Sequence, residues 1–415
     1  MKTILSILLI FNLFISLSQN KTDYLIENRF DLTKDNFKFP QNDFKIIGFG
    51  AYHGSSKTYD AELLIFKNLI YQNLLDFYAP EINYSQAYYF NEYLKNGDEK
   101  LLKDLVLSFQ KIVVQEGTIE TFNHWKNIKK INDSLNSKDK IKIIGFDMIF
   151  DYKYPIKLLL ELTDKIQNCS SRDSLQKLIG NDDLNFGTFN PTIQNSIKNF
   201  VDDFNKKKSD FIQSINDTVI FNHLIKNLEY TFQPQLNREK IIYSNFVDLN
   251  SIFNLKSKKL FFKYGFSHIL KAKENNSTSF FSLLIENQNY SKNDIITIMG
   301  YLTKSSVLWD KKYDKDGNYS KFTTKKGFGI GDYWREYFKG IENLKETTIS
   351  DLTLFRLNME NSPFKEGTDL IEIKMFLKES NSKTLKEKRT TDFIDYAILI
   401  SNSYNQTPIE ELENR

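Results

Sequence analysis

The chain has 415 residues, of which 40% are hydrophobic and 26% charged, a composition typical of a globular protein and not of a disordered one. Its 56 lysines and arginines nearly balance its 53 acidic residues, so charge gives no case for a nucleic-acid or membrane-surface partner. Cys169 is the only cysteine, which excludes an intramolecular disulfide and a cysteine-rich metal site.

The first 19 residues have the pattern of a signal peptide. Lys2 supplies a positive start, residues 4–17 are nearly all apolar, and small residues around Ser18 suit a signal peptidase. The apolar run of about 14 residues is shorter than the roughly 20 that span a bilayer as a helix. We therefore expect a secreted or periplasmic protein that is not held at the membrane after cleavage.

A short buried strand is expected to follow a polar, irregular lead-in over residues 20–45. This strand begins near Ile46, closes on glycines, and is followed by His53 and by a helix predicted over 57–73. Ligands of open α/β sheets bind beyond the carboxyl ends of the strands, so His53 is a candidate functional residue. The alternative is a histidine that only fills a turn.

Three further predicted strands each lead into a loop that presents a polar side chain. They are 75–80, followed by Glu81; 140–144, followed by Asp147; and 258–264, followed by His268. A carboxylate close to an imidazole can fix its tautomer and raise its basicity, as a general base requires. We therefore expect two imidazoles and a carboxylate to converge in one cleft at the carboxyl edge of the sheet. Glu81 by itself could equally be an exposed loop residue.

The rest of the chain is predicted to continue the alternation of helices and strands, without an internal repeat. Helices are predicted over 84–115, 121–135 and 238–253, a helical insertion over 151–235, strands over 294–302 and 393–400, and a polar tail over 403–415. This order predicts an α/β fold with a central, largely parallel sheet flanked by helices. We expect a single domain over 46–402 that carries the insertion.

Two motifs suggest ligands but are better explained otherwise. The stretch 314–317, Asp-Lys-Asp-Gly, resembles a calcium loop, but Lys312 stands where such a loop needs an oxygen ligand, which favours a hairpin turn. The glycine-rich stretch 325–331 lacks the spacing and the strand-to-helix setting of a nucleotide fingerprint.

Several short motifs resemble those of the erythromycin esterase family, within the wider group that includes haem-binding ChaN-like proteins and TIKI/TraB-type proteases. The similar stretches are Phe49–Gly54 around His53, Glu81 after the second strand, Asn91-Glu92-Tyr93, Gly145-Phe146-Asp147-Met148, Arg238 with Asn245 on one helix, and the turn Tyr264–His268. They occur in the family's order over most of the chain from residue 46 to residue 400.

The chain departs from the family pattern at two positions that matter for chemistry. Gly50 stands where the family has a glutamate, and Gly265 stands where it has the first histidine of a second pair. An arginine often found on the first helix has no counterpart in 60–62. Gly50 to His53 still fits the G-x-x-H form of the TIKI/TraB branch.

The resemblance implies a hydrolase of ester or lactone bonds that forms no covalent intermediate. His53 would take a proton from water, Glu81 would orient His53 or the water, and His268 would stabilise or protonate the oxyanion. Asp147 and Arg238 would support these residues. No G-x-S-x-G motif suggests a nucleophilic serine.

The implied partner is a small-molecule ester or lactone, with no nucleic acid, and a monomer is expected. The resemblance implies no cofactor, although His53, Glu81 and His268 could form a divalent metal site. The missing family residues leave open a second interpretation, in which a catalytically degenerate protein binds a small molecule or a partner in the same cleft. Removal of one member of an acid–base set commonly costs several orders of magnitude in rate.

Overall fold

The computed structural model describes residues 21–34, 37–39, 43–110, 113–181, 184–233, 235–275, 277–315 and 319–412. The predicted signal peptide lies outside these residues, as does part of the calcium-like stretch 314–317. The chain divides into two compact units. The first comprises the described residues of Met1–Leu74 and Lys263–Thr407, and the second those of Leu75–Phe262 and Pro408–Arg415.

The protein has the predicted mixed α/β fold, with an eight-stranded, largely parallel sheet in the order β1-β11-β13-β6-β2-β5-β3-β4. Strand β6 is parallel to both β13 and β2, and β3 is parallel to β4. The pairs β1–β11 and β11–β13 are antiparallel. Parallel sheets are normally covered on both faces, and the continuous apolar runs of the central strands fit that rule.

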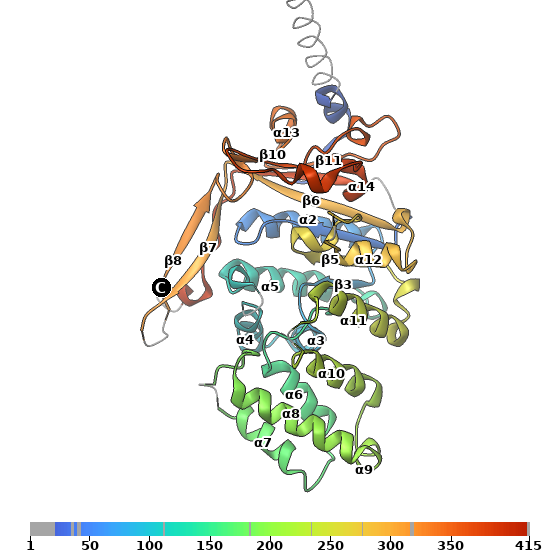
Figure 1. The fold of residues 1–415 in the computed structure, drawn as a ribbon, viewed down its shortest axis with the longest axis vertical. Helices are drawn as coiled ribbons and strands as arrows, with labels where there is room; N and C mark the ends of the chain where they lie inside the picture. Colours follow the sequence, from blue (N-terminus) through green and yellow to red (C-terminus); the bar gives the residue numbers. More distant parts are fainter. Residues whose placement is uncertain are drawn as a thin grey trace, which may run out of the picture. The chain divides into compact units, whose positions relative to one another are not determined.

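The first unit contains five strands of this sheet, drawn in blue, orange and red in Figure 1. They are β1 (Arg29–Asp31), β2 (Ile46–Gly50), β6 (Ile295–Thr303), β11 (Leu352–Arg356) and β13 (Tyr396–Ser401). All residues of β2, β6 and β13 are buried. Its longer helices are α2 (Ser56–Tyr71), α12 (Phe280–Glu286) and α13 (Ile341–Thr347), with the single turn α14 (Thr390–Phe393).

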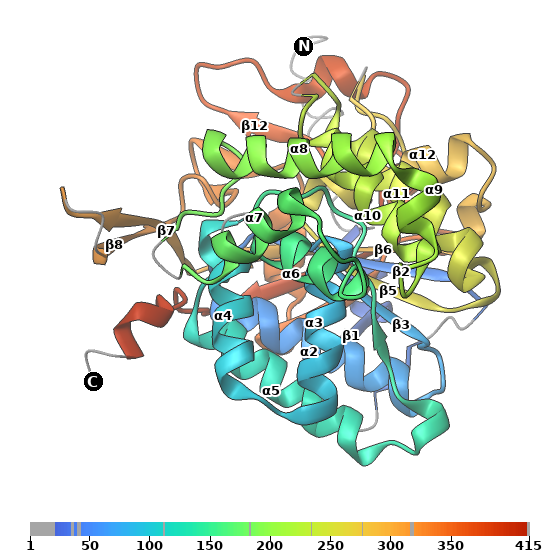
Figure 2. The same ribbon diagram turned by 90° about the horizontal axis from the view of Figure 1, so that it is seen from below.

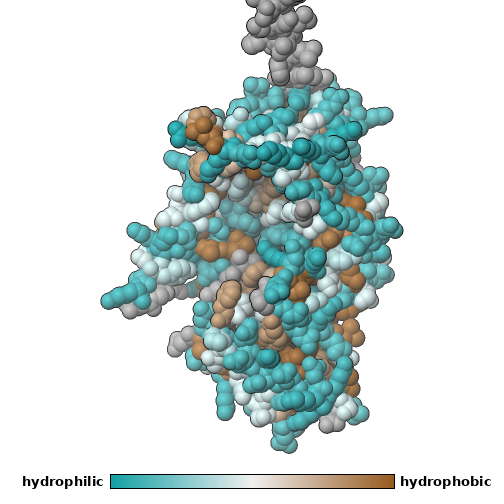
Figure 3. Space-filling view, in the orientation of Figure 1, coloured by the Kyte–Doolittle hydropathy of each residue, from teal (hydrophilic) through white to brown (hydrophobic). Residues whose placement is uncertain are grey.

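Two small antiparallel sheets extend the first unit. Strands β7 (Ser306–Tyr313) and β8 (Tyr319–Lys326) form a hairpin that projects from the strands of this unit in Figure 1. The outer part of this hairpin is teal and white in Figure 3, so its residues there are hydrophilic or of intermediate hydropathy. Strands β9 (Asp332–Tyr333), β10 (Glu336–Phe338) and β12 (Ile373–Met375) form the other sheet. The pairing of Tyr313 with Tyr319 confirms the predicted hairpin.

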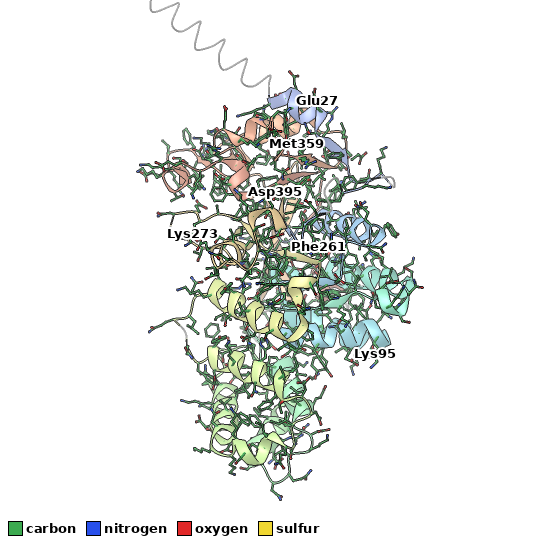
Figure 4. All side chains as sticks on the ribbon, turned by 90° about the vertical axis from the view of Figure 1, so that its right-hand side faces the viewer. Glu27, Lys95, Phe261, Lys273, Met359 and Asp395 are labelled. Atoms are coloured by element: carbon green, nitrogen blue, oxygen red, sulfur yellow. The ribbon has the colours of Figure 1, made fainter. Side chains whose placement is uncertain are left out.

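A buried ion pair stabilises the interior of the first unit. Lys271 Nζ lies 2.6 Å from both carboxylate oxygens of Asp395, and the two side chains are 3% and 7% exposed. Asp395, labelled in Figure 4, also accepts hydrogen bonds from the backbone N–H of Thr297 and the amide of Asn358. The carboxylate therefore ties the start of β13 to β6 and has the additional hydrogen bonds that a buried charge needs.

The second unit holds β3 (Phe77–Pro80), β4 (Lys142–Ile143) and most of β5 (Leu260–Tyr264), together with a set of helices. The helices are α3 (Tyr84–Asn96), α4 (Glu99–Phe109), α5 (Ile119–Ser134), α6 (Lys153–Leu162), α7 (Ser170–Ile179), α8 (Pro191–Lys206), α9 (Lys208–Ile212), α10 (Thr218–Tyr230) and α11 (Arg238–Phe253). Helices α6 to α10 occupy the stretch in which a helical insertion was predicted. Helices α7 and α8 pack against each other (Figure 2).

Helix α8 shows why this insertion is helical. Asn190 caps the helix by accepting from the backbone N–H groups of Thr192 and Ile193, and Pro191 stands at the first helical position, where it is favoured. The buried side chains recur at helical spacing: Ile193, Ile197, Phe200, Val201 and Phe204. One face of the helix is therefore apolar and packs inward.

The lead-in and the tail are more ordered than the sequence predicted. Residues 21–27 are helical, and β1 pairs with β11 where an irregular segment was expected. The buried side chains of Tyr24 and Leu25 explain the difference, because they anchor the segment to the core. In the tail, Gln406 and Ile409 are buried. Within the described part of the chain, every helix is too short or too polar to cross a membrane.

Candidate functional site

Arg238 joins two of the predicted site residues in the second unit. Its Nη2 atom lies 2.6 Å from Oε1 of Glu81, and its Nε atom lies 2.9 Å from Oδ1 of Asp147. Nη2 also donates to Oδ2 of Asp147, which makes the pair with that carboxylate bidentate. The structure thus brings together Glu81 and Asp147, which follow different strands, and Arg238, the first residue of α11.

The two carboxylates of this cluster are buried, whereas the arginine is partly exposed. Glu81 is 2% and Asp147 0% exposed, while the side chain of Arg238 is 28% exposed. Burial alone would lower the pKa of Arg238, but the carboxylates of Asp147 and Glu81 outweigh it and raise the pKa above its ordinary value. The ring of Phe150, 5.2 Å from the guanidinium carbon, covers one face of the cation.

Backbone contacts fix the loops that present the two carboxylates. The N–H of Asp147 donates to the carbonyl of Ile82, 3.0 Å away, so the loop after β4 is bonded to the loop after β3. Asn83 and Gln86 form a capping box that starts α3 directly after Glu81. Glu81 is therefore held between the end of a strand and the start of a capped helix.

Gly145 is required for this arrangement. A Cβ atom at this position would lie 2.3 Å from the backbone oxygen of Asn83 and 2.5 Å from that of Ile82. Backbone atoms cannot move aside as the end of a flexible side chain can. The glycine of the Gly-Phe-Asp-Met motif thus permits the close approach of the two loops.

Asparagines on α10 and α11 hold the loop that carries Asp147. The side-chain amide of Asn245, on α11, donates to the carbonyl of Phe146 at 2.9 Å and to Oδ1 of Asn227 at 2.7 Å. Asn227 lies on α10 and its amide is 3.3 Å from Nε2 of His223. This chain of hydrogen bonds orients the residue that precedes Asp147, and it explains why an asparagine follows the arginine on α11.

A third asparagine stabilises the short strand β4. Asn91, on α3, donates from Nδ2 to the carbonyl of Ile143 at 2.8 Å and accepts from the N–H of Ile143 at 2.9 Å. Its side chain thus replaces a neighbouring strand at the edge of the sheet. This contact gives the Asn-x-Tyr motif a structural role, because β4 is only two residues long.

His53 and His268 both lie in the first unit. His53 is half-buried in the loop after β2. The next residue, Gly54, has φ +87°, a conformation that favours glycine, and its carbonyl accepts from Leu308 and Gln406. His268 lies in the 3₁₀ turn η4 (Phe266–Ile269), is 8% exposed and meets the ring of Tyr264 edge-on, with the ring centroids 5.8 Å apart.

Strand β2 packs closely on η4, and this explains the departure at Gly50. A Cβ atom at Gly50 would lie 2.9 Å from Cδ1 of Ile269 and 3.2 Å from Sδ of Met299. Ile269 and Met299 are fully buried. The space that a glutamate would need at position 50 is therefore filled by apolar side chains.

Tyr52, next to His53, is a neutral hydroxyl at neutral pH. Burial and, to a smaller extent, the charge of Glu336 raise the pKa of Tyr52. Among the described residues, no group of three histidine, cysteine, aspartate or glutamate side chains is arranged to hold a metal ion. Cys169 is buried.

The sequence did not point to Asn83 or Asn227, although both help to position Glu81 and Asp147. The capping box at Asn83 carries a recognisable signal, since an asparagine followed three residues later by glutamine marks a helix start. Asn227 carries none, because an asparagine inside an amphipathic helix has no distinctive spacing.

No family model matches the chain, and no curated protein matches it in sequence. Several solved structures are similar, and three of them match over most of the chain. A Bacillus cereus protein has a TM-score of 0.63 at 13% identity, and the match covers 94% of this chain and 99% of that one. A succinoglycan biosynthesis protein has a TM-score of 0.62 at 13% identity over the same shares. An erythromycin esterase mutant in its open conformation has a TM-score of 0.57 at 12% identity, covering 89% of this chain and 93% of that one.

These likenesses define the class of fold. The chain shares its fold, over nearly its full length, with an erythromycin esterase and with the two other proteins. A fold can carry many activities, so the chemistry has to be argued from the residues of the site.

Proposed function

We propose that the protein is an exported hydrolase of the erythromycin esterase type, acting on ester or lactone bonds of a small molecule. The observation that supports the proposal most directly is the cluster of Arg238 with Glu81 and Asp147, at the ends of β3 and β4, in a fold shared with an erythromycin esterase. Buried charges cost free energy, so two buried carboxylates that share one partly exposed arginine within a shared fold favour a functional role.

Glu81 is proposed to orient the attacking water or His53. Arg238 donates to Oε1 of Glu81, and carboxylate oxygens can each accept a further hydrogen bond, from water or from an imidazole N–H. Arg238 and Asp147 are proposed as positioning residues, which keep Glu81 in one orientation.

His53 is proposed as the general base that takes the proton from water, and His268 as the group that stabilises or protonates the oxyanion. Each imidazole follows a strand of the sheet, as general bases of α/β enzymes often do. The water attacks the carbonyl carbon, the C–O bond to the leaving alcohol breaks, and that alcohol receives a proton. The reaction consumes one water and needs no cofactor.

The purified protein should be incubated with p-nitrophenyl esters and with a macrolide lactone. The proposal predicts turnover of at least one of them, abolished in His53→Ala while the variant keeps the wild-type melting temperature. Turnover that is unchanged by His53→Ala would contradict the assigned base.

The second candidate is a protein of the same fold that binds a small molecule or a partner and has lost catalysis. The observation that favours it is Gly50, where Ile269 and Met299 occupy the space of the family's glutamate. Absence of turnover over a panel of esters, lactones and peptides, together with tight binding of a small molecule, would support this candidate over the first.

A further inference from the structure

A cavity of about 710 Å³ lies in the first unit, outside the cluster around Arg238. Its size falls within the range of about 300–1,000 Å³ that is usual for small-molecule sites. The residues that matter for its chemistry are Lys304, Lys326, Ser305, Ser403, Tyr333 and Tyr404.

The cavity stands at the carboxyl ends of two neighbouring parallel strands. Ser401, the last residue of β13, pairs with Thr303, the last residue of β6. Lys304 and Ser305 follow β6 directly, and Ser403 follows β13. Open α/β sheets bind their ligands at this edge.

Two lysines give the cavity a positive charge. Lys304 and Lys326 are exposed, and within the described part of the chain neither ammonium group has an ion-pair partner. Among the described residues of the lining, Asp332 is the one carboxylate, and it is already engaged: it accepts from the hydroxyl of Thr303 at 2.8 Å and from the N–H of Lys304 at 3.1 Å. It also forms an ion pair with Lys345, which compensates its charge.

The floor of the cavity is preorganised by buried hydroxyl groups. Ser305 and Ser403 are 5% and 3% exposed, and the N–H of Ser403 donates to Oγ of Ser305 at 3.1 Å. Oγ of Ser403 lies 2.6 Å from Oγ of Ser55, two residues after His53. Lys304 has φ +48°, an unusual conformation for a residue other than glycine, and such conformations occur more often at ligand sites.

Aromatic side chains line the rim. Tyr333 and Tyr404 are 39% and 79% exposed. Tyr333 continues into a row of exposed rings, with the ring centroid of Phe328 at 6.2 Å and that of Trp334 at 5.8 Å. Exposed rings next to a polar cavity supply the apolar contact area that an organic ligand needs.

We propose that this cavity is a binding site for a small organic molecule that carries a doubly charged oxyanion, such as a phosphate ester, next to a ring. The oxyanion lies between the ammonium groups of Lys304 and Lys326, and the ring contacts Tyr333. The charge of two ammonium groups matches that of a dianionic ligand better than that of a ligand with a single carboxylate. This site is separate from the proposed hydrolysis and does not depend on it.

Calorimetric titration of the full chain at mildly alkaline pH and low salt tests the proposal with three probes: phenylphosphonate, inorganic phosphate and benzoate. We expect phenylphosphonate to bind more tightly than phosphate, which lacks the ring, and than benzoate, which has one charge. The affinity should fall with added salt, because the contacts are electrostatic and partly exposed.

Matched variants locate the site. Lys304→Gln and Lys326→Gln should each weaken phenylphosphonate binding about tenfold, which corresponds to about 1.4 kcal/mol. Tyr333→Ala should weaken phenylphosphonate but leave phosphate unchanged. Lys378→Gln, which removes another exposed lysine of the same unit, is the control and should have no effect.

Reductive methylation of the wild-type protein gives a second measurement that needs no variant. Bound phenylphosphonate should protect Lys304 and Lys326, but not Lys378, from modification. The proposal is overturned if no probe binds at millimolar concentration. It is also overturned if phenylphosphonate binds but leaves Lys304, Lys326 and Lys378 equally reactive, and if Lys304→Gln and Lys326→Gln do not change its affinity.

Discussion

The Nε atom of Arg238 donates a hydrogen bond to Oδ1 of Asp147 at 2.9 Å, across 91 residues of sequence. Through Nη2 the same guanidinium contacts Glu81 at 2.6 Å. One side chain at the start of α11 thereby fixes the loops that follow β3 and β4. Glu81 is held in a single orientation because the donor that binds it is itself held by a fully buried carboxylate.

Asp147→Asn should destabilise the protein by about 3 kcal/mol, because it leaves the largely buried guanidinium with one carboxylate fewer. The substituted amide can still accept from the N–H of Met148, so the local turn should survive. Urea denaturation measures the change. The control is Asp133→Asn, which removes an exposed ion pair with Lys129 on α5 and should cost less than about 1 kcal/mol. Equal losses in the two variants would contradict the role given to Asp147.

Gly50→Ala should destabilise the protein by about 1–3 kcal/mol, because the new methyl group would overlap Cδ1 of Ile269 in a closely packed interior. Ile269→Val removes that atom. The same Gly50 substitution should therefore cost less in the Ile269→Val background, with a coupling energy of at least about 0.5 kcal/mol in a double-mutant cycle. Additive effects would show that Ile269 does not exclude a side chain at position 50.

Gly145→Ala should be more damaging than Gly50→Ala, because its methyl group would meet the backbone of Ile82 and Asn83 instead of a side chain. No side-chain truncation can relieve that overlap. We expect loss of the folded state, or a fall in melting temperature clearly larger than that of Gly50→Ala, by circular dichroism. A Gly145→Ala protein with wild-type stability would contradict the tight packing of the two loops.

Asp248 should make the stability depend on pH in the acidic range. Burial alone would raise its pKa, but hydrogen bonds and charge from His223 and Lys226 lower the pKa below its ordinary value. A carboxyl group whose pKa is lower in the folded than in the unfolded state stabilises the fold at pH values above its unfolded-state pKa, which is near 4. This contribution is lost as the pH falls through the folded-state pKa.

Asp248→Asn should accordingly cost up to about 1 kcal/mol at neutral pH, a modest figure because Asp248 and Lys226 are partly exposed. The cost should shrink as the pH falls through the folded-state pKa of Asp248 and vanish where the wild-type carboxyl group is protonated. Urea denaturation of both proteins across this range measures it. A difference that stays constant with pH would contradict the assignment.

The sequence predicted the strands and the polar residues that follow them better than their contacts. Buried apolar runs closed by glycine identified β2 and β5, and β3 and β6 were recognisable from their apolar runs. Gly300, which suggested a turn, lies inside β6 and pairs with Ile398. Strand β4 was predicted over five residues and has two, because the side chain of Asn91 completes its hydrogen bonds in place of further strand. The last strand was predicted to begin at Phe393, which instead ends helix α14, and β13 begins at Tyr396.

The sequence predicted which residues belong to the candidate site, but it did not predict which of them contact one another. Asp147 came from its place after a predicted strand, and Arg238 came from motif resemblance. Nothing in the sequence indicated that Arg238 contacts Glu81 and Asp147 at once, since that depends on where α11 begins. The cavity beside Lys304 was not predicted at all. Its residues lie in the segments that follow β6 and β13 and in β7, β8 and β9, and they have no common spacing along the chain.

The central claim is that His53 and Glu81 act in one hydrolytic reaction. The most direct test is kcat/KM for an ester substrate in the wild type, His53→Ala, Glu81→Gln and the double variant, with folding checked by circular dichroism. We predict that each single substitution lowers kcat/KM at least about a hundredfold, and that the double variant is no worse than the more impaired single variant. Losses that multiply in the double variant, or a His53→Ala protein as active as the wild type, would contradict the claim.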